Sequence, residues 1–261
     1  METIAAETLP LSANQLEGAF LTGWPALKQS FDGLWLWRYA RGFTRRSNSI
    51  QCLDPVDGAF AEQRISRLTD YSYRHRIIPT FRVTPLTAPE IIAVLDAREW
   101  TPDGASLVLA MRTPSAAYSV DFDTDLLDPT DPVWFKAVAQ LSGYDGKAAA
   151  LLHDLVSRIP GDVRGVLVRH RAGVPAAAAL AVVSSGIGTY FNVVTHPSAR
   201  RSGFGRTAMS AALNWTKSKG AAHQALQVAE DNGPALNLYR SLGFRTVYSY
   251  HYRLAPAARQ E

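Results

Sequence analysis

Apolar and polar positions change their spacing along this chain, and each change marks an expected element. Apolar residues recur three and four positions apart over 204–219, which predicts an amphipathic helix. An unbroken apolar run over 174–183 predicts a buried strand, joined by a turn at 171–173 to a partner strand at 162–170. Further helices are expected at 14–21, 59–76, 89–100, 131–141, 146–158 and 234–242. Further strands are expected at 34–39, 49–53, 81–84, 106–111, 118–122, 188–195, 224–229 and 245–254.

Helices and strands alternate in this order, which favours an α/β fold built on a mixed sheet. The first half reads strand, strand, helix, strand, helix, strand, and this order matches part of the second half. A break between the halves is expected at 113–115. The sequence therefore predicts two segments, 1–115 and 116–261, with the strand at 245–254 closing the sheet.

Composition narrows the class of protein. The chain has 261 residues, of which 47% are apolar, so it can bury a sizeable core. Its formal charge is +4, and its Lys and Arg residues are scattered rather than gathered in dense runs. This balance suits an anionic small ligand and argues against a nucleic-acid partner. No apolar run is long enough to span a bilayer, which argues against a membrane protein.

Cysteine and histidine usage adds two expectations. Cys52 is the only cysteine, so no disulfide can form within the chain and a reducing compartment is expected. The first residues are acidic and lack the basic segment of a secretory signal. We therefore expect a cytoplasmic protein, either a monomer or a homodimer. The six histidines show no metal-ligand spacing, so no metal site is predicted.

A basic loop with two glycines precedes the amphipathic helix. Gly203 and Gly205 lack Cβ atoms, so backbone N–H groups there can approach an anion closely. The helix N-terminus adds partial positive charge. Arg200, Arg201 and Arg206 supply full charges and forked donors. The loop is thus predicted to hold a phosphate group.

Other interpretations of this loop fit less well. The run 203–208 matches the G-x-G-x-x-A dinucleotide fingerprint, and Glu230 lies roughly where a ribose-binding acid is expected. That fingerprint requires a strand leading directly into its first glycine, whereas residues 197–202 intervene here. A Walker loop is excluded because no Gly-Lys-Ser/Thr follows. The remaining alternative is an ordinary surface turn before a helix, with no ligand-binding role.

A second motif supports the phosphate interpretation. It reads Asn232-x-x-Ala235-x-x-Leu238-Tyr239-x-x-Leu242-Gly243-Phe244. Together with Arg200-x-x-Gly203-x-Gly205, it resembles the two signature motifs of the GNAT superfamily of N-acetyltransferases. The resemblance covers about residues 163–254, and the segment 33–50 is similar to the N-terminal part of some bacterial two-lobed members.

The resemblance implies a GNAT acyl-CoA N-acyltransferase fold in tandem. Residues 1–115 would form a degenerate acetyltransferase-like lobe, because no two-glycine loop leads into a helix there. Residues 116–261 would form the N-acetyltransferase domain with one active site. The family implies acetyl-CoA as donor and a primary amine, on a small molecule or a peptide, as acceptor.

The resemblance also implies which residues bind acetyl-CoA. The pantetheine arm would pair with the backbone of Val193, Val194 and Thr195. The pyrophosphate would sit on the N–H groups of Ser202, Gly203, Phe204, Gly205 and Arg206. The phosphate charge would be neutralised by Arg200 and Arg201. Asn232 would contact the CoA arm, although it is also a preferred N-cap for the helix at 234–242.

The proton transfers are implied less completely. Tyr239 matches the tyrosine that protonates the departing thiolate in the family, and a core tyrosine is the alternative. Some relatives carry a glutamate as general base where this chain has Gln227, which cannot accept a proton. Glu230, Asp231, a water on Asn192 or a group from the first segment remain as alternatives.

The sequence thus predicts an enzyme that moves acetyl from acetyl-CoA to an amine by direct attack. A CoA-responsive binding or regulatory module without turnover is the other hypothesis. The glutamine at position 227 favours that second hypothesis, and Tyr239 argues against it. No Gly-x-Ser-x-Gly elbow points to a hydrolase.

Overall fold

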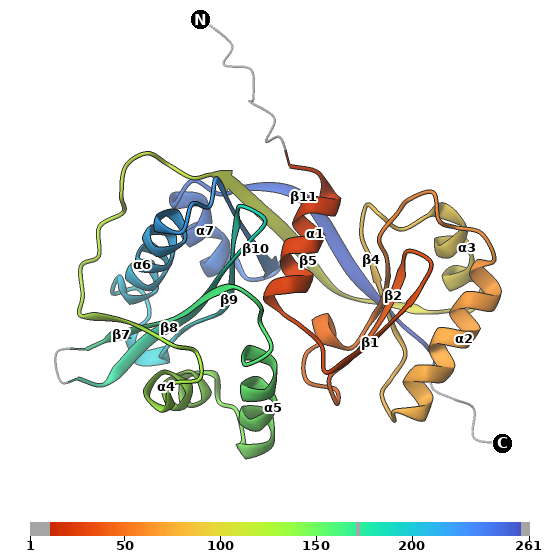
Figure 1. Cartoon of the computed structure of the whole chain (residues 1–261), viewed down its shortest axis with the longest axis horizontal. Coiled ribbons are helices and arrows are strands. Elements are labelled where there is room, and N and C mark those ends of the chain that lie inside the picture. Colours follow the sequence, from red (N-terminus) through yellow and green to blue (C-terminus); the bar gives the residue numbers. More distant parts are fainter. Residues whose placement is uncertain (1–10, 171–172, 257–261) are drawn as a thin grey trace, which may run out of the picture.

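The computed structural model describes residues 11–170 and 173–256. In this part of the chain, the strands form one mixed sheet with helices packed on both faces (Figure 1). The helices are α1 (Ala13–Gly23), α2 (Ala61–Arg74), α3 (Pro89–Ala97), α4 (Pro132–Ser142), α5 (Gly146–Val156), α6 (Phe204–Ser218) and α7 (Gly233–Ser241). Two 3₁₀ turns are η1 (Arg45–Ser47) and η2 (Pro197–Ala199). The strands are β1 (Lys28–Asp32), β2 (Trp35–Tyr39), β3 (Ile50–Cys52), β4 (Thr80–Val83), β5 (Thr101–Arg112), β6 (Thr124–Leu127), β7 (Asp162–Arg169), β8 (Pro175–Ser184), β9 (Ile187–Thr195), β10 (His223–Ala229) and β11 (Arg245–Leu254).

The two halves of the chain repeat one pattern. In the first, β1, β2 and β3 form an antiparallel meander, α2 crosses to β4, which runs parallel to β3, and α3 leads to β5. In the second, β7, β8 and β9 form the meander, α6 crosses to β10, parallel to β9, and α7 leads to β11. The last strands are exchanged: β11 lies between β4 and β5, and β5 lies between β11 and β10. Figure 1 shows these two long strands running through the centre.

The prediction that 245–254 closes the sheet is therefore wrong. β11 pairs antiparallel with β4, where Tyr252 lies opposite Arg82, and with β5, where Tyr248 lies opposite Val108. A strand paired on both sides leaves no edge. The sheet ends instead at β1 and β6.

The strand predicted at 118–122 is also wrong, because that segment is irregular and the strand lies further along, at β6. Tyr118 exchanges two backbone hydrogen bonds with the side-chain amide of Asn214 on α6, both at 2.9 Å. Its hydroxyl donates to the carbonyl of Leu242 at 2.7 Å. The alternation of apolar residues at 118–122 thus reflects packing against helices rather than a strand ladder.

The expected hairpin of 162–170 and 174–183 is confirmed, since β7 pairs with β8, and in the first half β2 pairs with β3 in the same way. Of the turn expected at 171–173 in the β7–β8 hairpin, residues 171–172 lie outside the described part of the chain. β1 was not expected, because its sequence is mostly polar and it lies at the sheet edge, where one face and one side meet solvent.

The apolar run in β8 is explained by burial on both faces. α6 covers one face of β7, β8 and β9, while α1 and α4 cover the opposite face of β8 and β9. The residues of β8 that pack with α6 are Ala177, Ala179 and Ala181. Those that pack with α1 and α4 are Ala178, Leu180 and Val182. Because successive strand residues point to opposite faces, both sets must be apolar.

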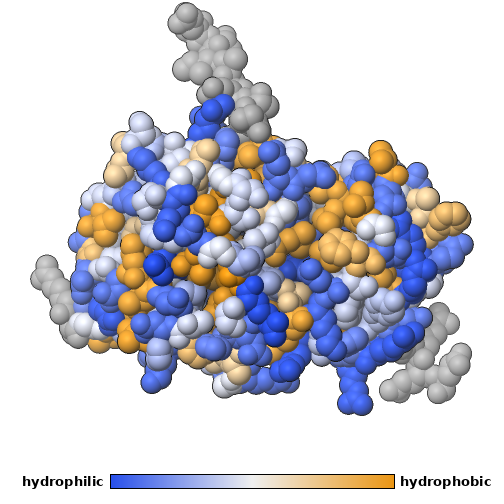
Figure 2. All heavy atoms as spheres, viewed as in Figure 1, coloured by the Kyte–Doolittle hydropathy of each residue, from blue (hydrophilic) through white to orange (hydrophobic). Residues whose placement is uncertain are grey.

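The surface carries no sign of a membrane span in the part of the chain that is described. None of its helices combines the length and apolar character needed to cross a bilayer. Figure 2 shows hydrophobic residues scattered among hydrophilic ones over one face of the molecule.

The strand exchange generates a prediction about the proposed boundary at residue 115. A chain of residues 116–261 lacks β5, so β10 and β11 each lose a central neighbour, and a chain of residues 1–115 lacks β11. We expect each fragment alone to be insoluble or to lack cooperative unfolding, because unpaired central strands expose backbone donors and acceptors. Co-expressed fragments should co-purify as a one-to-one complex, measured by size-exclusion chromatography with light scattering.

The control is the full chain with a protease site inserted at residue 115. After cleavage it should remain one particle under native conditions. Separation of the cleaved halves, or a sharp thermal transition from either fragment alone, would contradict the role given to the exchange.

Candidate active site

The parallel strands β9 and β10 separate at the centre of the sheet. Their pairing runs from Ile187 opposite His223 to Tyr190 opposite Leu226 and stops there, although both strands continue. β9 stays paired with β8 as far as Thr195, so only its β10 side is open. We call this opening the wedge. Backbone groups along it are available to pair with a ligand.

A β-bulge in β9 accompanies the wedge. The register with β8 shifts between Ala178 and Leu180, and Asn192 has a positive φ of 47°. A bulge adds one residue to the strand and turns it away from its neighbour. The side-chain Nδ2 of Asn192 is buried and has no hydrogen-bond partner among the described residues. A polar ligand or water in the wedge would satisfy this donor.

The basic loop begins where β9 ends. His196 precedes η2, and its Nδ1 lies 2.7 Å from the hydroxyl oxygen of Ser198, which gives His196 a structural role. Gly203 is the N-cap of α6, with φ of 89° and no side-chain cap. The first N–H groups of α6 are therefore unbonded by any capping side chain. A Cβ on Gly205 would lie 2.8 Å from Oγ1 of Thr195, so only glycine allows this approach of helix to strand.

The arginines of the loop differ in their contacts. Arg200 and Arg201 are exposed and form no ion pair with any described residue. Arg206 donates to the hydroxyl of Ser241 on α7 at 2.5 Å, which links the start of α6 to α7. Two arginines of the loop are thus available to an anion, and the third also positions the neighbouring helix.

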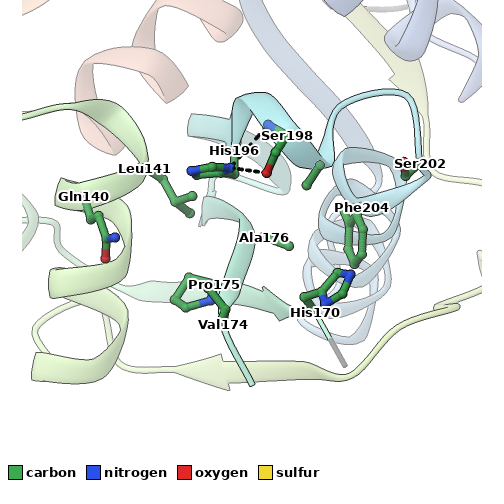
Figure 3. A pocket seen from close by; sticks show the side chains of 11 residues that line it. Gln140, Leu141, His170, Val174, Pro175, Ala176, His196, Ser198, Ser202 and Phe204 are labelled. Atoms are coloured by element: carbon green, nitrogen blue, oxygen red, sulfur yellow. Dashed lines mark hydrogen bonds between the residues drawn. The ribbon is translucent and has the colours of Figure 1, made fainter. Parts of the chain in front are cut away.

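A cavity of about 410 Å³ lies on the β8 side of this loop, between α4 and the β7–β8 hairpin (Figure 3). Of the predicted site residues, only Ser202 and Phe204 line it. The ring of His170 lies 5.8 Å from that of Phe204. Val193, Val194 and the β10 edge do not line this cavity, so it is separate from the wedge.

The second motif forms α7 and the turn after it. Asn232 is exposed, and its side-chain oxygen accepts from the N–H of Ala235 at 3.2 Å, so it does cap the helix. Tyr239 is 6% exposed and packs edge-to-face on Phe244, with ring centroids 6.1 Å apart. Burial raises the pKa of the Tyr239 phenol to about 12, although the positive charge of Arg46 acts to lower it. Among the described residues, its hydroxyl has no hydrogen-bond partner.

A second cavity, of about 280 Å³, opens along β10 beyond the last pair with β9. The first half of the chain and the exchanged strand β11 supply much of its lining, including Arg46 and Tyr250. The Arg46 guanidinium lies 5.7 Å from the ring centroid of Phe191 on β9. The hydroxyl of Tyr250 donates to Oε1 of Gln227 at 3.2 Å. Arg46 thus contacts β9 and lines the same cavity as Gln227 of β10.

Buried charges lie beside this cavity. Glu17 on α1 forms an ion pair with Arg82 on β4 and accepts from the Tyr248 hydroxyl at 2.6 Å. Burial and the Glu17 carboxylate raise the pKa of the Tyr248 phenol, which keeps it protonated. Arg38 on β2 is buried nearby. Sequence reasoning missed these residues, although an arginine inside an apolar strand run, as in WLWRY and FRV, was an available signal of a buried charge.

Comparison with known proteins agrees with this geometry. A family described as "Probable histone acetyltransferase Rv0428c C-terminal" matches residues 12–253. The chain belongs to this family. It is a GNAT-type acetyltransferase, as the two motifs predicted.

Several relatives match over most of this chain. The "Uncharacterized N-acetyltransferase YobR" of Bacillus subtilis (strain 168) is 24% identical over 246 residues, covering 92% of this chain and 97% of its own. A GCN5-related N-acetyltransferase from Kribbella flavida superposes with a TM-score of 0.72 at 19% identity, over 94% of this chain and 96% of its own. A tandem GNAT protein from the clavulanic acid biosynthesis pathway, solved without AcCoA, gives 0.66 at 13% identity, over 98% and 92%. The tandem GNAT fold predicted from the sequence is thereby confirmed.

No three His, Cys, Asp or Glu side chains gather as metal ligands within residues 11–170 and 173–256. The only carboxylate that lines the small void beside Gln227 is Glu17, and it is held by Arg82. Glu230 and Asp231 are exposed at the end of β10. Gln227 itself cannot act as a general base, because a side-chain amide does not take up a proton.

The buried pair generates a stability prediction for this GNAT protein. In a Glu17→Gln variant, the Arg82 charge stays buried without a carboxylate, so we expect the free energy of unfolding to fall by about 3–5 kcal/mol. The matched control is Glu62→Gln, which breaks the Arg98 ion pair on a glutamate that is 60% exposed. That change should cost less than about 1 kcal/mol. Urea unfolding followed by circular dichroism measures both, and equal losses would contradict the burial argument.

Proposed function

We propose that this protein transfers an acetyl group from acetyl-CoA to a primary amine by direct attack. The observation that carries the proposal is the open wedge between β9 and β10, which ends at the uncapped, basic N-terminus of α6. A thioester with a long polar arm and a pyrophosphate needs a backbone edge followed by an anion site. This chain has both in sequence, along one strand and the loop after it.

The residues present fit acetyl-CoA in three respects. The open edge of Val193, Val194 and Thr195 suits β-like pairing with the pantetheine arm. The N–H groups from Ser202 to Arg206 suit the pyrophosphate, with Arg200 and Arg201 neutralising its charge. The unpartnered Nδ2 of Asn192, on the bulge of β9, offers a further donor. Asn232 caps α7 in this structure, and we propose that it also contacts the arm.

The proposed reaction is balanced as follows. The amine nitrogen bonds to the thioester carbonyl carbon, the carbon–sulfur bond breaks, one proton leaves nitrogen and one reaches sulfur. Backbone donors at the wedge would stabilise the oxyanion. Tyr239 would donate its phenol proton toward the thiolate, and its raised pKa ensures that this proton is present at neutral pH.

That raised pKa also defines how Tyr239 would act. Complete transfer from a phenol of pKa about 12 to a thiolate of about 8.5 is uphill by roughly 5 kcal/mol. A hydrogen bond to the sulfur as charge develops costs much less than complete transfer. We propose that Tyr239 stabilises the leaving thiolate in this way.

The base that takes the amine proton stays open among Glu230, Asp231 and a water on Asn192. Glu17 is the carboxylate from the first half that the fold brings beside Gln227, and its ion pair with Arg82 opposes a role as base. The lack of a base at Gln227 supports the alternative, a CoA-responsive module without turnover. The acceptor would be a small molecule or a peptide amine.

Acetyl-CoA binding can be tested at the loop. Gly203 is a poor test position, because its φ of 89° strains any side chain and a Cβ there would lie 3.3 Å from the ring of Phe122. We expect the double variant Arg200→Ala, Arg201→Ala to weaken CoA binding roughly tenfold, or about 1.4 kcal/mol. Isothermal titration should give one CoA per chain, because the first half has no such loop. The double variant Arg74→Ala, Arg158→Ala, at two exposed arginines away from the loop, is the charge-matched control. Unchanged affinity in the folded Arg200→Ala, Arg201→Ala variant would refute the loop assignment.

Catalysis can be tested at Tyr239. Tyr239→Phe keeps the ring, so we expect CoA affinity to hold and kcat to fall about 10²–10⁴-fold. The matched control is Tyr118→Phe, which removes a hydroxyl bonded to the end of α7 and should cost about 1 kcal/mol of stability with kcat preserved. Acetyl-CoA turnover, read as thiol release over an amine panel, gives kcat. A kcat within about threefold of the parent protein, with chemistry rate-limiting, would rule out this role, and no turnover with any amine would favour the binding module.

A further inference from the structure

A donor-rich void lies beside the wedge, at the junction of the two halves. It has a volume of about 10 Å³, and its lining includes Arg38, Arg46, Gln51 and Arg82. It shares Arg46 and Gln227 with the 280 Å³ cavity along β10. The void and the larger cavity therefore lie next to each other, on either side of Arg46 and Gln227.

Its buried side chains offer donors without acceptors. Arg38 and Arg82 are each 3% exposed, and Gln51 is 1% exposed. Nε of Arg38, Nε and Nη2 of Arg82 and Nε2 of Gln51 have no hydrogen-bond partner among the described residues. Buried donors that lose water without gaining an acceptor are costly. A group that brings acceptor oxygens would remove that cost.

The charges around the void are also unbalanced. Three guanidinium groups surround one carboxylate, Glu17, which is already bonded to Arg82 and Tyr248. Arg38 donates only to carbonyl oxygens, those of Trp24 and Arg46, the latter at 2.6 Å. Burial, and then repulsion from Arg82, lower the pKa of Arg38 to about 10. The guanidinium therefore lacks a counter-ion.

Another buried arginine in the same half shows the usual arrangement. Arg64 bonds to the carboxylate of Asp57 at 2.6 Å and also pairs with Asp32. Arg46 has no such partner among the described residues, and its guanidinium lies over the rings of Trp24 and Phe191, with 5.4 and 5.7 Å to the centroids. Unlike Arg64, Arg38 and Arg46 form no ion pair with a described carboxylate.

We propose that the acetyl acceptor is an aminocarboxylic acid whose carboxylate binds Arg46 in the 280 Å³ cavity, next to the donor-rich void, with its amine directed to Gln227. The inference rests on the proposed acetyl transfer and names its acceptor. A guanidinium fork matches the two oxygens of a carboxylate. The acceptor enters through the 280 Å³ cavity. The same positive charges repel a lysine-rich peptide.

The kinetic experiment compares acceptors that differ only in the anion. A series of ω-aminocarboxylates from glycine to 6-aminohexanoate is assayed beside alkylamines of equal length, with acetyl-CoA saturating. We expect kcat/KM at least tenfold higher for the best aminocarboxylate than for its matched alkylamine. Equal rates, or faster acetylation of a lysine-rich peptide, would overturn the proposal. The compound 3-aminopropylphosphonate is assayed as well, to test for a phosphate-type anion. A higher kcat/KM for it than for 4-aminobutyrate would overturn the carboxylate assignment.

The variant experiment uses Arg46→Gln, because Arg46 is less buried than Arg38 and its backbone carbonyl, which Arg38 needs, is retained. We expect kcat/KM for the aminocarboxylate to fall at least tenfold more than kcat/KM for the matched alkylamine, so that the preference for the carboxylate is lost. Arg41→Gln, at an exposed arginine of the same loop, is the matched control and should change neither. An equal loss with both acceptors would overturn the proposal.

A binding experiment separates this inference from the proposed function. Butyrate and 4-aminobutyrate are titrated calorimetrically into the full chain, once without any CoA compound and once with CoA present. Butylamine, which lacks the carboxylate, is the comparison. We expect the carboxylates to bind, and to bind at least tenfold more weakly to Arg46→Gln. That result without turnover of any amine would reject the acetyl transfer and keep the anion site. Absence of carboxylate binding to the parent protein, whether or not amines are acetylated, would overturn the anion site.

Discussion

The exchange of β5 and β11 is the constraint on which the rest of the structure depends. Each half folds its own meander and crossover, yet each needs the last strand of the other to fill the centre of the sheet. The halves therefore cannot move apart without breaking backbone pairs on both strands. This rigid junction brings Arg46 of the first half against Phe191 and Gln227 of the second.

The junction also explains why charged residues are buried in a protein of modest charge. Arg38, Arg82 and Glu17 lie on elements of the first half that face the exchanged strand β11. Replacing them with apolar residues would be stable enough in many folds, since buried ion pairs seldom add net stability. Retaining an excess of buried guanidinium groups beside an open cavity is physically costly, and a ligand that supplies the counter-charge would offset that cost. In the proposed binding mode, the first half of the chain takes part in acceptor recognition as well as in packing.

The donor side and the acceptor side of the proposed active site rely on different kinds of interaction. The donor side relies on the backbone: an unpaired strand edge, a bulge at Asn192 and an uncapped helix N-terminus, with arginines adding charge at the surface. The acceptor side relies on side chains from both halves in a partly enclosed cavity. Arg206 at the start of α6 donates to Ser241 on α7, the helix that carries Tyr239, so the basic loop and this helix are joined by a hydrogen bond.

Local chemistry made several elements and motifs predictable from the sequence. Gly203 and Gly205 mark a backbone that must turn and approach closely, Asn232 caps a helix, and the β8 run can only be a strand buried on both faces. Periodicity misled at 118–122, where aromatic alternation serves packing on helices, and it could not show that β11 belongs to the other half. Strand order and the gathering of Glu17, Arg38, Arg46 and Arg82 were decided only by the tertiary structure, because they join residues far apart in the chain and no local preference encodes which distant edge a strand will pair with.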